Sequence, residues 1–139
     1  MHLQLTGVLS HELAEQSGMS YQDYIVLAVL TGQPDGAMRA FELGREIGWE
    51  KSRLSHHISR MTERGYVTKR KCKTDQRGAF VVVTPKGRRA IEAAAPGHVA
   101  GVRRHFVDLL SAKELQTVAA VASAVLDHLA AECDGVPVA

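Results

Sequence analysis

The fold is decided by residues 39–84, which read RAFELGREIGWEKSRLSHHISRMTERGYVTKRKCKTDQRGAFVVVT. A short helix is predicted over 39–47 and a longer one over 50–64, because apolar residues recur at spacings of three and four in both. Each stretch is followed by a glycine suited to a helix end, Gly48 and Gly65. Two short helices joined by a glycine-containing turn form the helix-turn-helix pattern.

The period of the sequence changes after Gly65. The stretches 66–73 and 79–84 are rich in valine, threonine and aromatic residues, and a polar segment lies between them at 73–78. This pattern predicts a β-hairpin with a charged tip. A helix-turn-helix followed directly by a basic hairpin is a winged helix, and the combination is much more specific than either half. We therefore predict a mainly α protein with a small β-wing, in the α+β class.

Two helices are predicted before this segment. Residues 3–16 carry a stripe of leucines at helical spacing and end near Gly18. The next helix begins after Ser20, which is a good N-cap residue. Asp23 would then lie near the positive end of the helix dipole.

Two more helices are predicted after the hairpin. Thr84-Pro85 supplies an N-cap and a proline at the first helical position. Pro96-Gly97 predicts a kink or break in this helix. Ser111 and Glu114 form a capping box for the final helix, and residues 134–139 are expected to be a loose tail.

The charge of the chain is segregated. Residues 45–90 hold thirteen Lys or Arg against four Asp or Glu, a net charge of +9, whereas the rest of the chain carries −7. A basic centre between mildly acidic ends is the electrostatic footprint expected of a protein that docks on a polyanion. The alternative is a solvated surface with chance clustering of charge.

The composition excludes several classes of protein. The 139 residues are 45% hydrophobic and 23% charged, as in a folded globular domain, and the longest apolar runs are far too short to span a bilayer. No signal-peptide pattern is visible, so we expect a cytoplasmic protein with no membrane partner. Cys72 and Cys133 fit neither a disulfide framework nor a zinc ribbon. The sequence shows no paired carboxylates on one helix face, no glycine-rich phosphate loop and no nucleophile motif, so we do not expect an enzyme.

The helix over 50–64 is the predicted recognition helix. Leu54, Ile58 and Met61 would hold it on the core, so that its opposite side faces outward. Short polar residues near its start suit a major groove about 12 Å wide, and Arg53 is the candidate for reading guanine. The alternative is a merely solvated helix surface. The predicted DNA contacts on this side are Lys51, Ser52, Arg53, Ser55, His56, Ser59 and Arg60.

Apolar stripes near both ends of the chain predict a homodimer. A winged helix needs only about 70 to 90 residues, so segments 1–19 and 97–133 are interpreted as dimerisation helices around a DNA-binding lobe at 20–96. Packing of the stripes on one another within one chain is the alternative. The predicted interface residues are Leu5, Leu9, Val102, Phe106, Leu109, Leu115, Val118, Ala122, Val125 and Leu129.

Several short motifs carry a family resemblance: WEKSRLSH at 49–56, RM at 60–61, RGYV at 64–67, DQR at 75–77 and VTPKG at 83–87. With these motifs the chain resembles the MarR (multiple antibiotic resistance regulator) family of bacterial transcriptional regulators. The resemblance covers almost the whole chain and is weakest over residues 1–16. It implies a winged-helix homodimer that binds a pseudo-palindromic operator in double-stranded DNA, most often as a repressor, and that often releases it on binding a small molecule.

The resemblance also assigns the wing. It implies that Arg77, at the hairpin tip, enters the minor groove while Asp75 braces its side chain. A narrow A·T-rich groove attracts an inserted guanidinium because its negative potential is enhanced. Lys69, Lys71 and Lys73 would lie near the phosphates, or they would protect an edge strand from unwanted pairing.

No cofactor is predicted, and three matters stay open. The resemblance implies a pocket for an organic effector, but nothing in the sequence identifies its lining or its ligand. His98 and His105, with Glu92 and Asp108 as carboxylates nearby in sequence, are candidate metal ligands and would make the chain a zinc-responsive family member. A winged-helix module that binds a protein is the other alternative, although such a module would more often expose apolar residues where this chain is basic.

Overall fold

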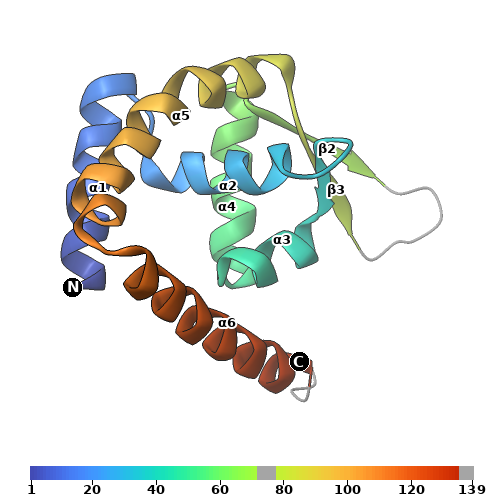
Figure 1. Ribbon diagram of the computed structural model, residues 1–139. Helices are drawn as coiled ribbons and strands as arrows, with labels where there is room; N and C mark the ends of the chain where they lie inside the picture. Colours follow the sequence, from blue (N-terminus) through green and yellow to red (C-terminus); the bar gives the residue numbers. More distant parts are fainter. Residues whose placement is uncertain (72–77, 135–139) are drawn as a thin grey trace. The chain divides into compact units, whose positions relative to one another are not determined.

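The computed structural model describes residues 1–71 and 78–134 (Figure 1). The described residues are mainly helical with one small sheet, which confirms the predicted fold class. The elements in chain order are α1 (His2–Ser17), α2 (Tyr21–Thr31), β1 (Ala37–Arg39), α3 (Ala40–Ile47), α4 (Lys51–Glu63), β2 (Val67–Lys71), β3 (Ala79–Val83), α5 (Pro85–His105), a 3₁₀ turn at Val107–Leu109 and α6 (Ala112–Asp134).

The chain divides into two compact units, Met1–Val99 and Ala100–Ala139. The boundary falls inside α5, so the first unit contains α1 to α4, the sheet and most of α5. Within the described part of the chain, no single helix is long and apolar enough to cross a membrane.

The sheet is antiparallel with the strand order β1-β3-β2. The hairpin of β2 and β3 is present as predicted, with Val67 opposite Val83 and Lys71 opposite Ala79. Strand β1 was not predicted, and Arg39, expected to begin a helix, instead ends this strand. Three residues are too few to show a period of two, and β1 forms because its edge pairs with β3 across a long sequence separation.

One apolar core holds the first unit together. The predicted inward residues of the recognition helix, Leu54, Ile58 and Met61, are all buried in it. They pack with side chains from α1, α2, α3, β2, β3 and α5, among which Leu27, Leu30 and Leu43 are completely buried. The core therefore fixes which face of α4 points to solvent.

The start of α5 explains the motif at 83–87. The Thr84 hydroxyl accepts the backbone N–H of Gly87 at 3.0 Å, which caps the helix, and donates to the carbonyl of Gly65 at 2.5 Å. A Cβ on Gly87 would collide with the backbone carbonyl of Tyr66. Only glycine allows the helix to approach the end of the helix-turn-helix this closely.

Of the predicted kink or break at Pro96-Gly97, the break is wrong, because α5 continues through Pro96 to His105. A proline inside a helix removes one backbone hydrogen bond and costs about 3 kcal/mol. Packing on both sides offsets this cost: Ile91 and Ala94 are buried, and His98 stacks on Tyr24. Gly97 lies next to the terminal amide of Gln16 in α1.

The second unit contains the end of α5, the 3₁₀ turn and α6. The predicted capping box is confirmed: the N–H of Ser111 donates to Glu114 at 2.8 Å, and the N–H of Glu114 donates to the Ser111 hydroxyl at 3.3 Å. The Ser111 hydroxyl also donates to the Glu114 carboxylate at 2.8 Å, and the two bonds that this carboxylate accepts from Ser111 lower the pKa of Glu114. An exposed ion pair joins Arg103 to Asp108 at 2.7 Å.

Candidate nucleic-acid interface

The predicted recognition surface lies on the solvent face of α4. Because Leu54, Ile58 and Met61 face the core, the helical period turns the predicted contact residues outward. Six of them are exposed and Ser59 is half-buried. The exposed six are Lys51, Ser52, Arg53, Ser55, His56 and Arg60.

The N-terminal end of this surface contains a stacked arginine. The guanidinium of Arg53 lies 4.3 Å from the ring centre of Trp49, a cation–π contact that restrains an otherwise flexible side chain. Ser52 donates to the Glu50 carboxylate at 3.0 Å, so this serine is held at the helix start. Arg53 is therefore exposed to solvent while its guanidinium is held against the ring of Trp49.

A buried polar cluster lies beneath α4, and the sequence did not predict it. Asp23 of α2 is only 1% exposed and accepts two bonds from Arg64, at 2.5 and 2.9 Å. The Nε2 atom of His57 lies 2.9 Å from the same carboxylate. Arg60 bonds Nδ1 of His57 at 3.1 Å, and Trp49 meets the imidazole edge-on at 5.2 Å. We call Asp23, Trp49, His57, Arg60 and Arg64 the His57 cluster.

An isolated acid on the apolar face of the 21–31 helix was the available signal for this cluster. The sequence pattern instead predicted that Asp23 interacts with the positive end of the helix dipole. The backbone N–H of Asp23 donates to the Ser20 hydroxyl at 3.1 Å, which confirms the predicted N-cap. The side chain is committed elsewhere, to a partner 41 residues away.

Acid should destabilise the folded chain. Burial lowers the pKa of His57 below its usual 6.5, although the Asp23 carboxylate opposes this shift, and burial lowers the pKa of His98 as well. The unfolded chain therefore binds these protons more tightly, so the free energy of unfolding is greatest above pH 6.5 and falls as the pH drops below it. Thermal melts between about pH 7.5 and pH 5.5 test this. A melting temperature that does not fall over this range would contradict it.

The wing and α4 form one continuous surface. Lys69 and Lys71 of β2 are exposed, and the Lys69 ammonium donates to the Ser59 hydroxyl at 3.3 Å, which bridges strand and helix. The remaining predicted wing residues, Lys73, Asp75 and Arg77, lie outside the described residues.

An arginine ladder on the sheet was not predicted. Arg39, Phe80 and Arg70 are direct neighbours across the three strands. Both guanidiniums lie over the Phe80 ring, at 5.1 and 5.4 Å from its centre. The sequence contains Arg70 within its basic run, but only the strand register shows that it shares a face with Arg39.

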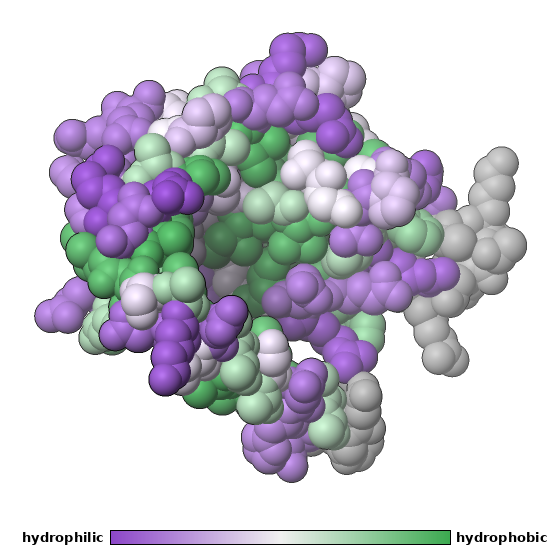
Figure 2. Space-filling view, viewed as in Figure 1, coloured by the Kyte–Doolittle hydropathy of each residue, from purple (hydrophilic) through white to green (hydrophobic). Residues whose placement is uncertain are grey.

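Most of the predicted dimer residues leave apolar surface uncovered. Along α6, Val118, Val121, Val125, Leu126 and Leu129 are exposed, and Leu109 in the 3₁₀ turn is exposed as well. Figure 2 shows hydrophobic surface over α6 and also over α1. In α1, however, Leu9 is buried and Leu5 is half-buried. The exposed members of the predicted set are Leu109, Val118, Ala122, Val125 and Leu129, and the half-buried ones are Leu5, Val102, Phe106 and Leu115.

The candidate metal ligands are not brought into a metal-binding group. Among the described residues, no three His, Cys, Asp or Glu side chains gather where they could hold an ion. His98 instead lies against two tyrosines, with ring centres 4.4 Å from Tyr24 and 6.1 Å from Tyr21.

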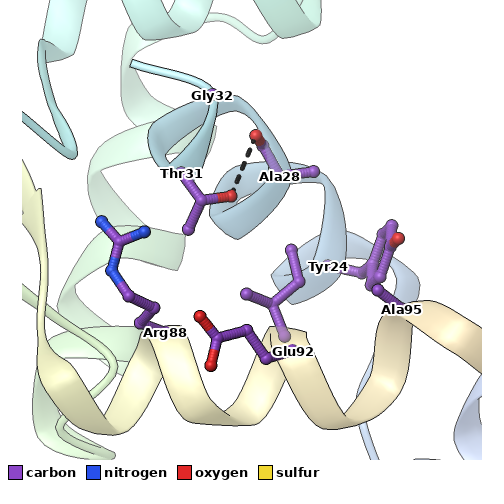
Figure 3. A pocket seen from close by; sticks show the side chains of 8 residues that line it. Tyr24, Ala28, Thr31, Gly32, Arg88, Glu92 and Ala95 are labelled. Atoms are coloured by element: carbon purple, nitrogen blue, oxygen red, sulfur yellow. Dashed lines mark hydrogen bonds between the residues drawn. The ribbon is translucent and has the colours of Figure 1, made fainter. Parts of the chain in front are cut away.

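A cavity of about 340 Å³ lies between α2 and α5 within the first unit (Figure 3). Its wall is largely apolar, and the charged side chains of Arg88 and Glu92 project from successive turns of α5. The Thr31 hydroxyl on the opposite wall is bonded to the carbonyl of Leu27 at 2.7 Å. The lining residues are Tyr24, Ala28, Thr31, Gly32, Arg88, Ile91, Glu92 and Ala95.

Comparison with known proteins gives a consistent result. A family model described as MarR family matches residues 17–78. The chain is 35% identical to AbsC, a MarR family transcriptional regulator from Streptomyces coelicolor, over 94% of this chain and 90% of that one, with a TM-score of 0.82. It is 30% identical to Sco3205, a MarR family regulator from the same organism solved in complex with DNA, over 92% and 83% of the chains, with a TM-score of 0.87.

A more distant structure shares the fold. A mutant MarR from E. coli, complexed with operator DNA, is 18% identical over 90% of this chain and 87% of that one, with a TM-score of 0.78. No curated protein sequence matches the chain. The winged helix, the exposed polar face of α4 and the two Streptomyces relatives lead to one conclusion: the chain belongs to the MarR family of DNA-binding transcriptional regulators, which are not enzymes.

Proposed function

We propose that the chain is a homodimeric repressor that binds a pseudo-palindromic operator, with α4 in the major groove and the wing in the minor groove. The observation that carries this proposal is the bridged surface of α4 and β2, where the Lys69 ammonium bonds Ser59. This surface offers exposed arginine, lysine, serine and histidine side chains and no exposed acid between Lys51 and Arg60. Such a set can reach base edges and phosphates together.

A relative supports the proposed binding to DNA. Sco3205, 30% identical to this chain, was solved in complex with DNA. In helix-turn-helix dimers, the two recognition helices enter successive major grooves, so the half-sites lie about one helical turn apart. The operator should therefore be an inverted repeat with that spacing.

The exposed apolar face of α6 supports the dimer. Val118, Val125 and Leu129 are more than two-fifths exposed, and they recur at intervals of seven and four along one side of the helix. A second copy presents the same face and can cover it with two-fold symmetry. The proposed occupant of this face is therefore another α6, joined by the other predicted interface residues.

Release by a small organic effector is also proposed, without an assigned ligand. The cavity between α2 and α5 supports this, because its volume is at the lower end of the range for small-molecule sites and its wall is largely apolar. It is built from two helices that also carry the core under α4.

Arginine substitutions test the DNA-binding mode. Arg53→Ala should weaken binding about 10- to 100-fold, since a bidentate arginine–guanine pair contributes about 1–3 kcal/mol of discrimination. Arg77→Ala should also weaken binding, because the wing would lose its minor-groove cation. The measurement is fluorescence anisotropy with a duplex that the wild-type chain selects from a random-sequence pool.

The matched control is Arg103→Ala. It removes the same charge from the second unit, where Arg103 pairs with Asp108, and should leave the affinity within about twofold, as expected for an exposed ion pair. An equal loss in all three variants would indicate that only net charge matters. Failure of the wild-type chain to select any duplex would overturn the proposed function.

A further inference from the structure

His57 is the one inward-facing histidine of α4, and it is bonded to a residue of the DNA-facing surface. Its side chain is 8% exposed, whereas Arg60, three residues later, is exposed on the solvent face. The two are joined by the 3.1 Å contact between Nη2 of Arg60 and Nδ1 of His57. A buried group therefore holds one of the predicted DNA contacts.

The partners of the imidazole fix its protonation state. A guanidinium has only donors, so Nδ1 must be the acceptor in its contact with Arg60 and must carry no proton. A carboxylate has only acceptors, so Nε2 must carry the proton that faces Asp23 at 2.9 Å. The cluster thus requires a neutral imidazole with its hydrogen on Nε2.

The ring itself is immobilised on two further sides. Trp49 contacts it edge-on, with an interplanar angle of 82°. Asp23 is in turn held by the paired bonds from Arg64, so α2 anchors the ring through a carboxylate that is almost completely buried. Nδ1 is consequently presented at a fixed place near the surface of α4.

We propose that His57 is a positioning residue for DNA binding: its neutral Nδ1 holds the Arg60 guanidinium in the orientation in which it contacts the operator. The inference rests on the proposed function and deepens it. An arginine side chain loses rotamer freedom when it is ordered. Ordering it before the encounter reduces the cost of binding.

Protonation of His57 removes this restraint. The added hydrogen would lie on Nδ1, so two donors would face one another and Arg60 would have to move away. The charged or titratable groups that face the ring are Asp23 from α2 and Arg60 and Arg64 from α4, and the two arginines also oppose an imidazolium. Operator affinity should therefore fall in acid. A positive charge added on the exposed surface would have the opposite effect, because it attracts phosphate.

A double-mutant cycle tests whether His57 acts through Arg60. Arg60→Ala should weaken binding to the selected duplex about 10-fold, the effect of losing one charge-assisted contact. His57→Gln, whose amide nitrogen can still donate towards Asp23 but whose oxygen is attached one carbon further out than Nδ1, should weaken it about 5-fold, near the value of one hydrogen bond. The double variant should bind no worse than Arg60→Ala alone. Multiplying losses, or no loss from either single change, would overturn the proposal.

The pH dependence of operator affinity distinguishes a positioning role of His57 from a purely structural one. In the His56→Gln background, which leaves His57 as the one imidazole of α4, affinity should fall several-fold as the pH drops through the range in which histidines titrate. The fall should vanish when Arg60→Ala is added. His98→Gln is the matched control, because it removes a half-buried histidine that packs against Tyr24 of α2, and the fall should persist.

The remaining outcomes are also decisive. An affinity that rises in acid in the His56→Gln background would overturn the inference while leaving the proposed function intact. Failure of the wild-type chain to select any duplex would overturn the proposed function and this inference with it. Melting curves of every variant, recorded at each pH of the binding measurements, verify that it remains folded at the binding temperature.

Discussion

Replacing Arg64 by methionine is expected to lower the free energy of unfolding by about 3 kcal/mol. Asp23 is 1% exposed, and Arg64 supplies both of its guanidinium bonds. Methionine can retain much of the apolar stem of arginine but leaves the carboxylate without its charge partner. Removing one member of a buried pair is costly because the other charge stays desolvated.

Two comparisons isolate this cause. Adding Asp23→Asn to the Arg64 variant should recover part of the loss, since a neutral amide is less costly to bury than an unpaired carboxylate. Arg103→Met, which breaks an ion pair whose partners are 61% and 50% exposed, should cost less than about 1 kcal/mol. Denaturant unfolding at one fixed protomer concentration measures all three, because dimerisation adds to apparent stability. Equal losses for the two arginine variants would contradict the assignment.

A glutamate in place of Val125 should abolish the dimer and, with it, tight operator binding. Val125 is 52% exposed on the apolar face of α6. In the proposed dimer that face is buried against a second copy, and an unpaired carboxylate there costs several kcal/mol. A dimer binds its second half-site at an effective concentration of about the millimolar range, so a monomer should lose roughly 100-fold or more in affinity.

The control places the same charge on another face of α6. Ser123→Glu lies two residues earlier, about 200° around the helix, and is exposed. It should leave both the dimer and operator affinity nearly unchanged. Sedimentation velocity gives the oligomeric state, and anisotropy with the selected duplex gives the affinity. A wild-type chain that remains monomeric, or a Val125 variant that remains dimeric, would refute the α6 interface.

The helix-turn-helix and the hairpin were predictable because their determinants are local. Periods of 3.6 and 2 in the apolar residues mark helices and strands, and Gly48 adopts the left-handed conformation expected at the end of α3, with φ of 69°. The inward set of α4 followed from the same period. The exposed face of α4, which is the predicted DNA-contact surface, consists of the remaining positions of the same helix.

The elements that were missed depend on distant partners. Strand β1 has no pattern of its own and exists through its pairing with β3. The continuity of α5 through Pro96 depends on packing by Ile91, Ala94 and His98, which outweighs the local cost of proline. In each case a tertiary contact decided against the local preference.

The amino-acid sequence by itself determined a basic winged helix with a polar recognition helix, since period, capping and charge are properties of neighbouring residues. The tertiary packing, in contrast, commits the Asp23 carboxylate to two bonds from Arg64 and places it 2.9 Å from Nε2 of His57. The physical reason is that a buried carboxylate is stable only beside compensating donors. Those donors lie more than thirty residues away in the sequence, and local periodicity cannot indicate contacts between residues that far apart.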